Sequence, residues 1–504
     1  MATPKAAPAP GPSAPAADPR RWLVLAVICT AYTMVGLDLT VMNLALPSAQ
    51  TDLGFSDADR QWIVTAYALP FGSLLLFCGR LSDLIGRKES FLGGVAGFVL
   101  ASAVGGAANS FGMLVTARAF QGAFAAMLAP AVLALVATTF TDPQEKGKAF
   151  GIFSAVASSG AALGLIVGGA LTSALDWRWC MYINLLIGGA ALIGGQMWMT
   201  KQPRTGARMD IPGVLLASAG MFCVVYGFSN AAEDSWSAPT TWGLLLAGAV
   251  LLAAFAGWQA RAQNPLLPPR IVLDRNRGGA YLTVLFVGMG LFGVMLFLIY
   301  FMQHNLGYSA ITSGVALLPM IVFTTVAASV GAMKLLPKHG PKPLITIGMV
   351  LNAAGMAWLT MIDADSTYAA DLLGPLLAIG FGMGLVYSAA ARTGTSGVAP
   401  HEAGIASACI NTGQQIGGAV GTALLNTIAA TAGANWLEDH AQGRPTADQL
   451  GLAAIEGYIT VFWWCAAIFA FGAVLVGVLM RSGPLPVPAE PGQQPSEQTK
   501  PAHS

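Results

Sequence analysis

Fourteen long apolar stretches constrain this sequence more than any other feature. Each is close to the ~20 residues that a helix needs to cross the ~30 Å hydrocarbon core of a bilayer. They lack the apolar–polar alternation of barrel strands, which excludes a transmembrane barrel. The chain is 55% hydrophobic and 10% charged, whereas a soluble domain carries about 25% charged residues. The sequence therefore predicts an all-α polytopic membrane protein.

The Lys and Arg residues predict how these spans are oriented. With the N-terminus inside, the inner segments hold 21 of the 25 Lys and Arg residues and the outer segments hold three, while Arg118 lies within a span. Cytoplasmic loops carry such an excess. We therefore expect a multi-pass protein of the plasma (inner) membrane with both termini in the cytoplasm. The expected spans are Trp22–Leu46, Trp62–Gly79, Phe91–Ala108, Phe111–Val136, Ala149–Leu171, Cys180–Met199, Ile211–Ser229, Trp242–Trp258, Tyr281–Phe301, Ile311–Leu336, Leu344–Ile362, Leu372–Ala391, Ile405–Ala430 and Tyr458–Met480.

Other classes of function find little support in the composition. Residues 1–21 are Ala/Pro-rich and residues 482–504 are Pro/Gln-rich, and both are expected to be disordered cytoplasmic tails. The six cysteines have no ligand spacing, so no metal is expected. No nucleophile motif, phosphate-binding loop or soluble catalytic domain is present, which argues against an enzyme, a cofactor or direct use of ATP. The expected partners are lipid and small molecules, not nucleic acid, and we expect the protein to function as a monomer.

Asp38 is the one carboxylate that lies clearly within an apolar span. An acid at such a depth costs about 2.5–3.5 kcal/mol on insertion scales, so it normally faces a cavity or a partner and often handles ions or protons. Asp38 is therefore the first candidate functional residue.

A glycine- and charge-rich turn between the second and third spans is the second informative feature. Its glycine can adopt a positive φ and its acid can cap a helix or pair with a base; an ordinary positive-inside loop is the alternative. The segment strongly resembles the signature loop of the major facilitator superfamily, in which it gates the cytoplasmic side. The residues that carry the resemblance are Gly79, Arg80, Asp83, Gly86, Arg87 and Lys88.

The resemblance extends along the chain and favours the fourteen-spanner drug:proton antiporter branch. The sequence LDLTVMNLALP (residues 37–47) is similar to that branch's first-helix motif, and residues 118–122 are similar to the fourth-helix motif, whose Arg is implicated in proton coupling. Trp177, Arg178 and Trp179, with Tyr182 and Asn184, match the outer turn that follows the fifth helix, and residues 411–418 are similar to the branch's pattern in the penultimate pair of helices. The fifth span keeps the spacing of the antiporter motif with Gly151, Gly160, Gly164, Gly168 and Gly169.

Two departures from the family pattern limit the prediction. Leu165 follows Gly164 where the antiporter motif has a proline, so antiport is less secure than transport itself. No acid occurs in Ile311–Leu336, where some exporters of divalent cations carry one. That absence disfavours such cations as substrates.

The resemblance implies a fold of two six-helix halves, residues 22–199 and 278–481, each built from 3+3 repeats around a central site. Residues 200–277 then form a linker with two inserted transmembrane helices, expected at the periphery. The implied function is proton-coupled efflux of hydrophobic small molecules, such as drugs or antibiotics, by alternating access. A proton-coupled transporter for a specific metabolite, by symport or export, is the alternative, ahead of a channel or a membrane enzyme.

Asp38 and Arg118 are the expected proton-coupling residues. Asp38 lies about 13 Å before Pro47 and Arg118 about 10 Å after Phe111, at 1.5 Å per residue, so the two charges lie at similar depth on helices that the fold makes neighbours. We expect an ion pair that breaks when Asp38 takes up a proton; a permanent structural salt bridge is the alternative. No His lies within a span, which excludes a histidine relay.

Polar and adaptable side chains in other spans are candidates for the substrate cavity. Asn411, Gln414, Gln415 and Gly418 have the spacing of one helix face. Packing between helices or against lipid is the alternative for each residue. The full candidate set is Asn43, Tyr67, Gln121, Phe292, Asn411, Gln414 and Gln415, with Phe71, Met289 and Met295 as further apolar wall.

Overall fold

The computed structural model describes residues 19–483, except residues 56, 141, 202–208, 234–235, 400–401 and 442–443. Every regular element within this part is helical. The two predicted tails fall almost entirely outside the described residues. The side chains of Asn43, Phe292 and Leu165 also fall outside them, although all three residues lie in helices.

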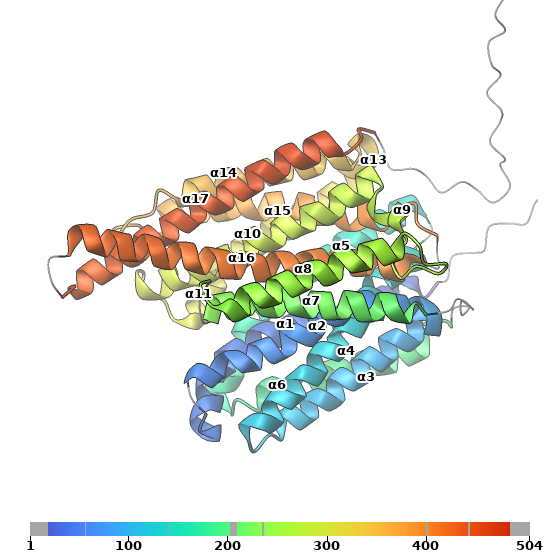
Figure 1. Ribbon diagram of the computed structural model, residues 1–504, viewed down its shortest axis with the longest axis horizontal. Helices are drawn as coiled ribbons and strands as arrows, with labels where there is room; N and C mark the ends of the chain where they lie inside the picture. The colour runs from blue at the N-terminus through green and yellow to red at the C-terminus, as the bar shows by residue number, and fades with distance from the viewer. Residues whose placement is uncertain are drawn as a thin grey trace, which may run out of the picture.

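The helices fall into two groups of six with a shorter insertion between them (Figure 1). The first group is α1 (Arg21–Leu53), α2 (Asp57–Ile85), α3 (Arg87–Gly106), α4 (Phe111–Thr139), α5 (Pro143–Ala174) and α6 (Trp179–Trp198). The insertion is α7 (Ile211–Glu233), α8 (Pro239–Gln259) and the short α9 (Pro269–Val272). The second group is α10 (Arg275–His304), the interrupted span α11 (Ala310–Ala316), α12 (Leu318–Val330), η1 (Gly331–Leu335) and α13 (Leu336–His339), then α14 (Pro341–Leu359), α15 (Leu373–Gly394) with its initial turn η2 (Tyr368–Leu372), α16 (Ala403–His440) and α17 (Ala447–Leu479).

The lengths of these helices agree with the predicted spans. In the described part of the chain, 13 helices are long and apolar enough to cross a membrane. The remaining predicted span, Ala149–Leu171, lies inside α5, which is 32 residues long and packs along α1. The predicted fold class is confirmed.

The two halves meet where α2 and α4 pack on α16 and where α5 packs on α12. In Figure 1 the helices α1, α2, α3, α4 and α6 lie in the lower part of the molecule, and α14, α15 and α17 lie in the upper part. These crossings are the contacts that must change if the halves are to move relative to one another.

The inserted pair is only partly peripheral, which differs from the expectation. α8 packs on α7 and exposes most of its surface, as expected. α7 instead packs against both α2 and α16. The hydroxyl groups of Thr65 on α2 and Ser229 on α7 are 3.3 Å apart, and Trp236, just after α7, donates from Nε1 to Thr427 Oγ1 on α16 at 2.6 Å. One inserted helix therefore contacts both halves.

Asp210 joins the ends of α7 and α8. Its carboxylate accepts hydrogen bonds from the backbone N–H groups of Gly213 and Leu266 and from the side chains of Trp258 and Gln259, at 2.8–3.3 Å. Burial alone would raise the pKa of Asp210, but these four hydrogen bonds favour the charged form and lower it below the ordinary value. The carboxylate is therefore ionised near neutral pH and closes the inserted hairpin.

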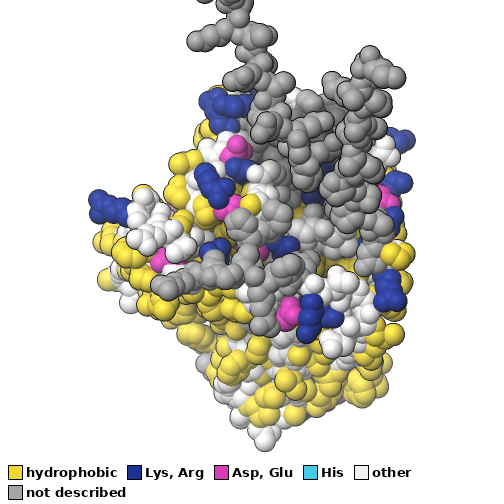
Figure 2. All heavy atoms as spheres, turned by 90° about the vertical axis from the view of Figure 1, so that its right-hand side faces the viewer, with side chains coloured by type: hydrophobic (Ala, Val, Ile, Leu, Met, Phe, Trp, Pro, Cys, Tyr) yellow, Lys and Arg dark blue, Asp and Glu magenta, His cyan; other side chains and the backbone are white. Residues whose placement is uncertain are grey.

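Figure 2 faces the right-hand end of Figure 1 and shows Lys and Arg side chains spread over that face. Hydrophobic side chains cover the lower part and the sides of the same view. This separation of charged from apolar surface is the arrangement that a bilayer-spanning bundle requires.

Candidate functional site

Asp38 on α1 and Arg118 on α4 form a buried ion pair. Arg118 Nη1 lies 2.5 Å from Asp38 Oδ2, and the two side chains are 1% and 2% exposed. Each charge offsets part of the cost of burying the other. The structure thus brings together the two residues that the sequence predicts to lie at similar depth in neighbouring helices.

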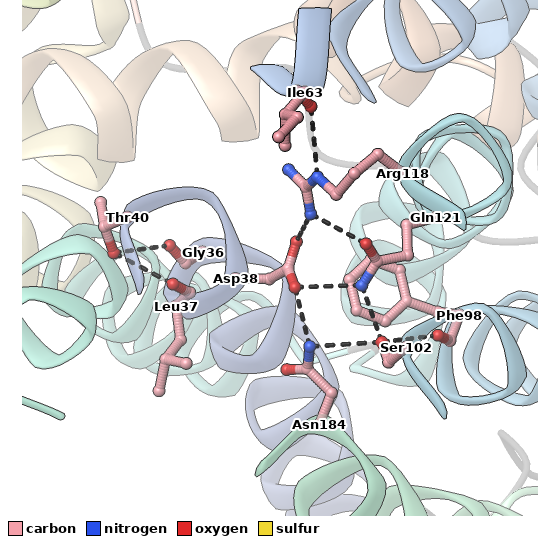
Figure 3. A network of polar contacts seen from close by, with 10 residues as sticks. All are labelled: Gly36, Leu37, Asp38, Thr40, Ile63, Phe98, Ser102, Arg118, Gln121 and Asn184. Atoms are coloured by element: carbon pink, nitrogen blue, oxygen red, sulfur yellow. Dashed lines mark hydrogen bonds and ion pairs between the residues drawn. The ribbon is translucent and has the colours of Figure 1, made fainter. Parts of the chain in front are cut away.

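The carboxylate of Asp38 accepts two further hydrogen bonds, both at Oδ1 (Figure 3). Gln121 Nε2 donates at 3.1 Å, and Asn184 Nδ2 on α6 donates at 2.7 Å. Gln121 is one turn from Arg118 and also accepts from Arg118 Nη1 at 2.9 Å. Three donors from two helices therefore hold the ionised form of Asp38 in place.

The guanidinium of Arg118 is bound on its other sides by α2. Its Nε donates to the carbonyl oxygen of Ile63 at 3.4 Å, and its carbon Cζ lies 4.5 Å from the centre of the Tyr67 ring. A cation over an aromatic face is stabilised by about 0.5–2 kcal/mol. Arg118 therefore has partners on α2 and α4 in addition to Asp38.

Ser102 on α3 orients both amides of this network. Its hydroxyl donates to the Phe98 carbonyl at 2.8 Å, so its oxygen is left to accept from Gln121 Nε2 at 2.7 Å and Asn184 Nδ2 at 3.2 Å. Each amide nitrogen is thereby turned toward Asp38. Sequence reasoning matched Asn184 only as part of an outer-turn pattern and missed Ser102 altogether.

The glycines of α5 pack directly against the turn of α1 that carries Asp38. A methyl group on Gly164 would lie 1.8 Å from Thr40 Oγ1, and one on Gly168 would lie 3.0 Å from the Cα of Val41. Gly160 faces Gly36 in the same way, at 3.4 Å. Gly169 lies in the same helix and is half-buried. The small residues allow α1 and α5 to approach at backbone distance.

The predicted gating loop spans the end of α2 and the start of α3. Asp83 accepts hydrogen bonds from the backbone N–H groups of Gly404 at 3.0 Å and Ile405 at 3.3 Å, at the N-terminus of α16. A carboxylate is favoured there because the first N–H groups of a helix have no intrahelical partner. Arg87 Nη2 lies 3.5 Å from Asp83 Oδ1. The loop of one half thus contacts the other half.

The remaining loop residues fix the turn itself. Gly86 has a φ of +106° at the junction of α2 and α3, a conformation that favours glycine. Lys88 donates to the last carbonyls of α6, those of Gln196 and Met199, at 3.2 and 2.6 Å. Gly79 lies so close to α16 that a methyl group on it would be 2.6 Å from Ala408 Cβ. Arg80 is buried beside this crossing.

A model of the Major Facilitator Superfamily matches residues 28–422. The chain belongs to this superfamily. It is a transporter rather than an enzyme. It is 47% identical over 469 residues to the puromycin resistance protein of Streptomyces alboniger, covering 92% of each chain. It is 39% identical over 411 residues to the cephamycin export protein of Amycolatopsis lactamdurans, covering 80% of this chain and 84% of that protein. Its fold is similar to that of the human organic anion transporter MFSD10, with a TM-score of 0.62 at 14% identity, over 91% of this chain and 100% of that one.

In this major facilitator transporter, two of the predicted cavity residues contact Arg118, and their role in the cavity stays a prediction. Tyr67 and Gln121 are fully buried partners of Arg118 and belong to the ion-pair network. Gln414 on α16 donates to Tyr387 Oη on α15 at 3.3 Å, and Asn411 bonds back to the carbonyl of Ser407 in its own helix.

Three predicted cavity residues remain: Gln415, Asn43 and Phe292. Gln415 is half-buried on the same stretch of α16 as Gln414. The predictions for the Asn43 and Phe292 side chains fall outside the described part of the chain. Asn411, Gln414 and Gln415 therefore stay predicted cavity residues on α16.

The outer turn of the superfamily pattern forms a second, exposed ion-pair cluster. Arg178 Nη2 lies 2.7 Å from Asp52 Oδ2 at the end of α1, and Trp177 Nε1 donates to the same oxygen at 3.2 Å. The hydrogen bonds from Trp177 and Arg178 lower the pKa of Asp52 below its usual value. This cluster ties the start of α6 to the end of α1, away from Asp38.

Proposed function

We propose that this transporter exports hydrophobic small molecules, antibiotics among them, in exchange for protons. The buried Asp38–Arg118 pair carries the proposal, because it is a carboxylate whose charge is balanced by one cation on another helix. The relatives named for puromycin resistance and cephamycin export support an antibiotic as cargo. The protein acts as a monomer in the plasma membrane, and the proton gradient drives it.

The pair couples protons to movement because its two partners lie on different helices. When substrate or a change in packing draws α1 from α4, Asp38 is left ionised in a medium of low dielectric constant and binds a proton. When the pair re-forms, Arg118 displaces that proton. Each proton that crosses 100 mV supplies about 2.3 kcal/mol for this cycle.

The Asp83 contact supplies the gate of the same cycle. With both termini in the cytoplasm, the contact between Asp83 and the N-terminus of α16 lies at the cytoplasmic end. Opening toward the cytoplasm requires α2 and α16 to separate there. The glycines of α5 let α1 shift while the two helices stay packed.

The test is proton movement in inside-out vesicles that contain the protein and an acidic lumen. Puromycin is the first compound to add. Further compounds are chosen from a drug-susceptibility panel that compares cells lacking the protein with cells overproducing it. Antiport removes protons from the lumen as the compound enters. Symport of a specific metabolite, which Leu165 in place of proline leaves open, carries protons in the same direction as the compound and gives the opposite sign. No proton movement with any transported compound would refute the proposal.

A further inference from the structure

Asn184 carries a buried polar atom that the ion pair does not explain. Its side-chain nitrogen donates to Asp38 Oδ1 at 2.7 Å and to Ser102 Oγ at 3.2 Å. Its carbonyl oxygen Oδ1 has no hydrogen-bond partner among the described residues, and the side chain is 0% exposed. In Figure 3 this oxygen points away from the network. Buried polar atoms without a partner are rare in native structures and call for a physical explanation.

The present orientation of the amide follows from the ionised state of Asp38. A carboxylate can only accept hydrogen bonds, so the atom that faces it must be a donor. The Ser102 oxygen requires the same, because its own proton goes to the Phe98 carbonyl. Both neighbours therefore turn the nitrogen of Asn184 inward and leave its oxygen outside.

A protonated Asp38 reverses this requirement. The neutral carboxyl group donates one hydrogen bond and needs an acceptor near Oδ1, where the amides of Gln121 and Asn184 lie. Gln121 Oε1 accepts from Arg118 at 2.9 Å, so a half-turn of that amide would break a bond to a cation. Asn184 Oδ1 has no such bond to lose within the described structure. Asn184 is the amide that can turn.

We propose that Asn184 is a positioning residue whose amide reverses when Asp38 takes up a proton. The proton moves onto the carboxylate and no covalent bond breaks. Asn184 Oδ1 then accepts the Asp38 O–H and the rotated hydroxyl of Ser102. Asp38 is thus hydrogen-bonded to α6 in both protonation states, and its neutral form is held there while Arg118 keeps its partners on α2 and α4. The inference rests on the proposed role of Asp38 as the proton site.

Asp38 is the group in this network to which the proposed function assigns the proton. Arg118 faces it from α4 and stays cationic. Asp38 also interacts electrostatically with Tyr67 on α2 and Cys180 on α6, and Tyr67 interacts with Tyr32 on α1. Tyr and Cys side chains are ordinarily neutral at pH 7. α3 contributes Ser102 and α5 contributes the glycine face described above, neither of which titrates.

The test is the infrared difference spectrum between neutral and acidic pH for the full-length protein in liposomes. The wild-type protein is expected to gain the band of a neutral carboxyl group and to show a paired shift of an amide carbonyl band. Asn184→Leu should lose the amide pair completely, and its carboxyl band should move. Asn184→Ser, which also lacks an amide, gives the same test if the leucine variant does not fold.

Asn352→Leu is the control, because Asn352 on α14 is equally buried and neither of its amide atoms has a hydrogen-bond partner among the described residues. This variant should keep both features of the wild-type spectrum. An amide pair that survives in Asn184→Leu would overturn the inference and leave the proposed function standing. Other acids also protonate over this range, among them Asp83, whose pKa burial raises to about 6, so the Asp38 signal is the part of the wild-type carboxyl band that Asp38→Asn removes. If Asp38→Asn removes none of that band, the proton role of Asp38 fails and the inference fails with it.

Discussion

Replacing Asp38 by Asn removes the charge on which the proposed coupling depends. The substitution keeps the size of the side chain and one oxygen that can accept from Arg118. It also places an amide nitrogen opposite the nitrogen atoms of Gln121 and Asn184, which now donate to the carboxylate at 3.1 and 2.7 Å. The variant therefore loses the proton site and has to reorient at least one neighbouring amide.

The partners that Arg118 retains place the expected loss of stability in Asp38→Asn at the low end of the range for a broken buried ion pair. Removing one partner of a buried ion pair costs about 3–5 kcal/mol, because the other charge is left buried. Arg118 keeps Gln121 Oε1, the Ile63 carbonyl and the Tyr67 ring. We expect a loss of about 3 kcal/mol, which lowers the midpoint of thermal unfolding without preventing folding.

The effect on transport should be far larger. One proton moving through 100 mV supplies about 2.3 kcal/mol, which sustains about a fiftyfold concentration ratio of substrate. In proteoliposomes with an imposed proton gradient, the wild-type protein should accumulate substrate toward this ratio. Asp38→Asn should only let substrate equilibrate. The control is Asp52→Asn, which removes an acid that is 45% exposed in the outer-turn cluster and should leave accumulation unchanged. Gradient-driven accumulation by Asp38→Asn would refute the reasoning.

Three further predictions concern packing and the inserted hairpin. Gly122→Ala places a methyl group 2.1 Å from a backbone oxygen of α2, which should cost about 1–3 kcal/mol and lower the thermal midpoint, whereas Gly112→Ala, with nothing within 4 Å, should not. Gly79→Ala should separate α2 from α16 and slow efflux; distances between spin labels on the two helices should lengthen, and an unchanged distance distribution would contradict this. Asp210→Ala leaves four donors without their acceptor and should cost on the order of 3 kcal/mol. Because the folded-state pKa of Asp210 is lowered, its contribution is present above the usual Asp pKa and is lost as the pH falls through the folded value. The wild-type thermal midpoint should therefore drop at acidic pH more than that of the Asp210→Ala variant.

Some features of this transporter follow from the sequence because they are local. The length of an apolar stretch and the side on which Lys and Arg gather depend on the bilayer alone, so the spans were predictable one by one. The turn at Gly86 was predictable for the same reason, since a positive φ favours glycine wherever the residue lies. The ion pair needed one further step, the matching of Asp38 and Arg118 by depth.

The tertiary structure alone decided which side chains meet. Ser102 makes the same bond to the carbonyl four residues before it in any helix, so its sequence context carries no sign of the two amides that it orients. Tyr67 fits a cavity wall as well as it fits a charge network, and only the approach of α2 to Arg118 places it in the network. α7 has the apolar length expected of a peripheral span, yet it contacts both halves because it packs against α2 and α16. Contacts between helices depend on residues far apart in the chain, and helices of similar composition can pack in many ways until the whole bundle is assembled.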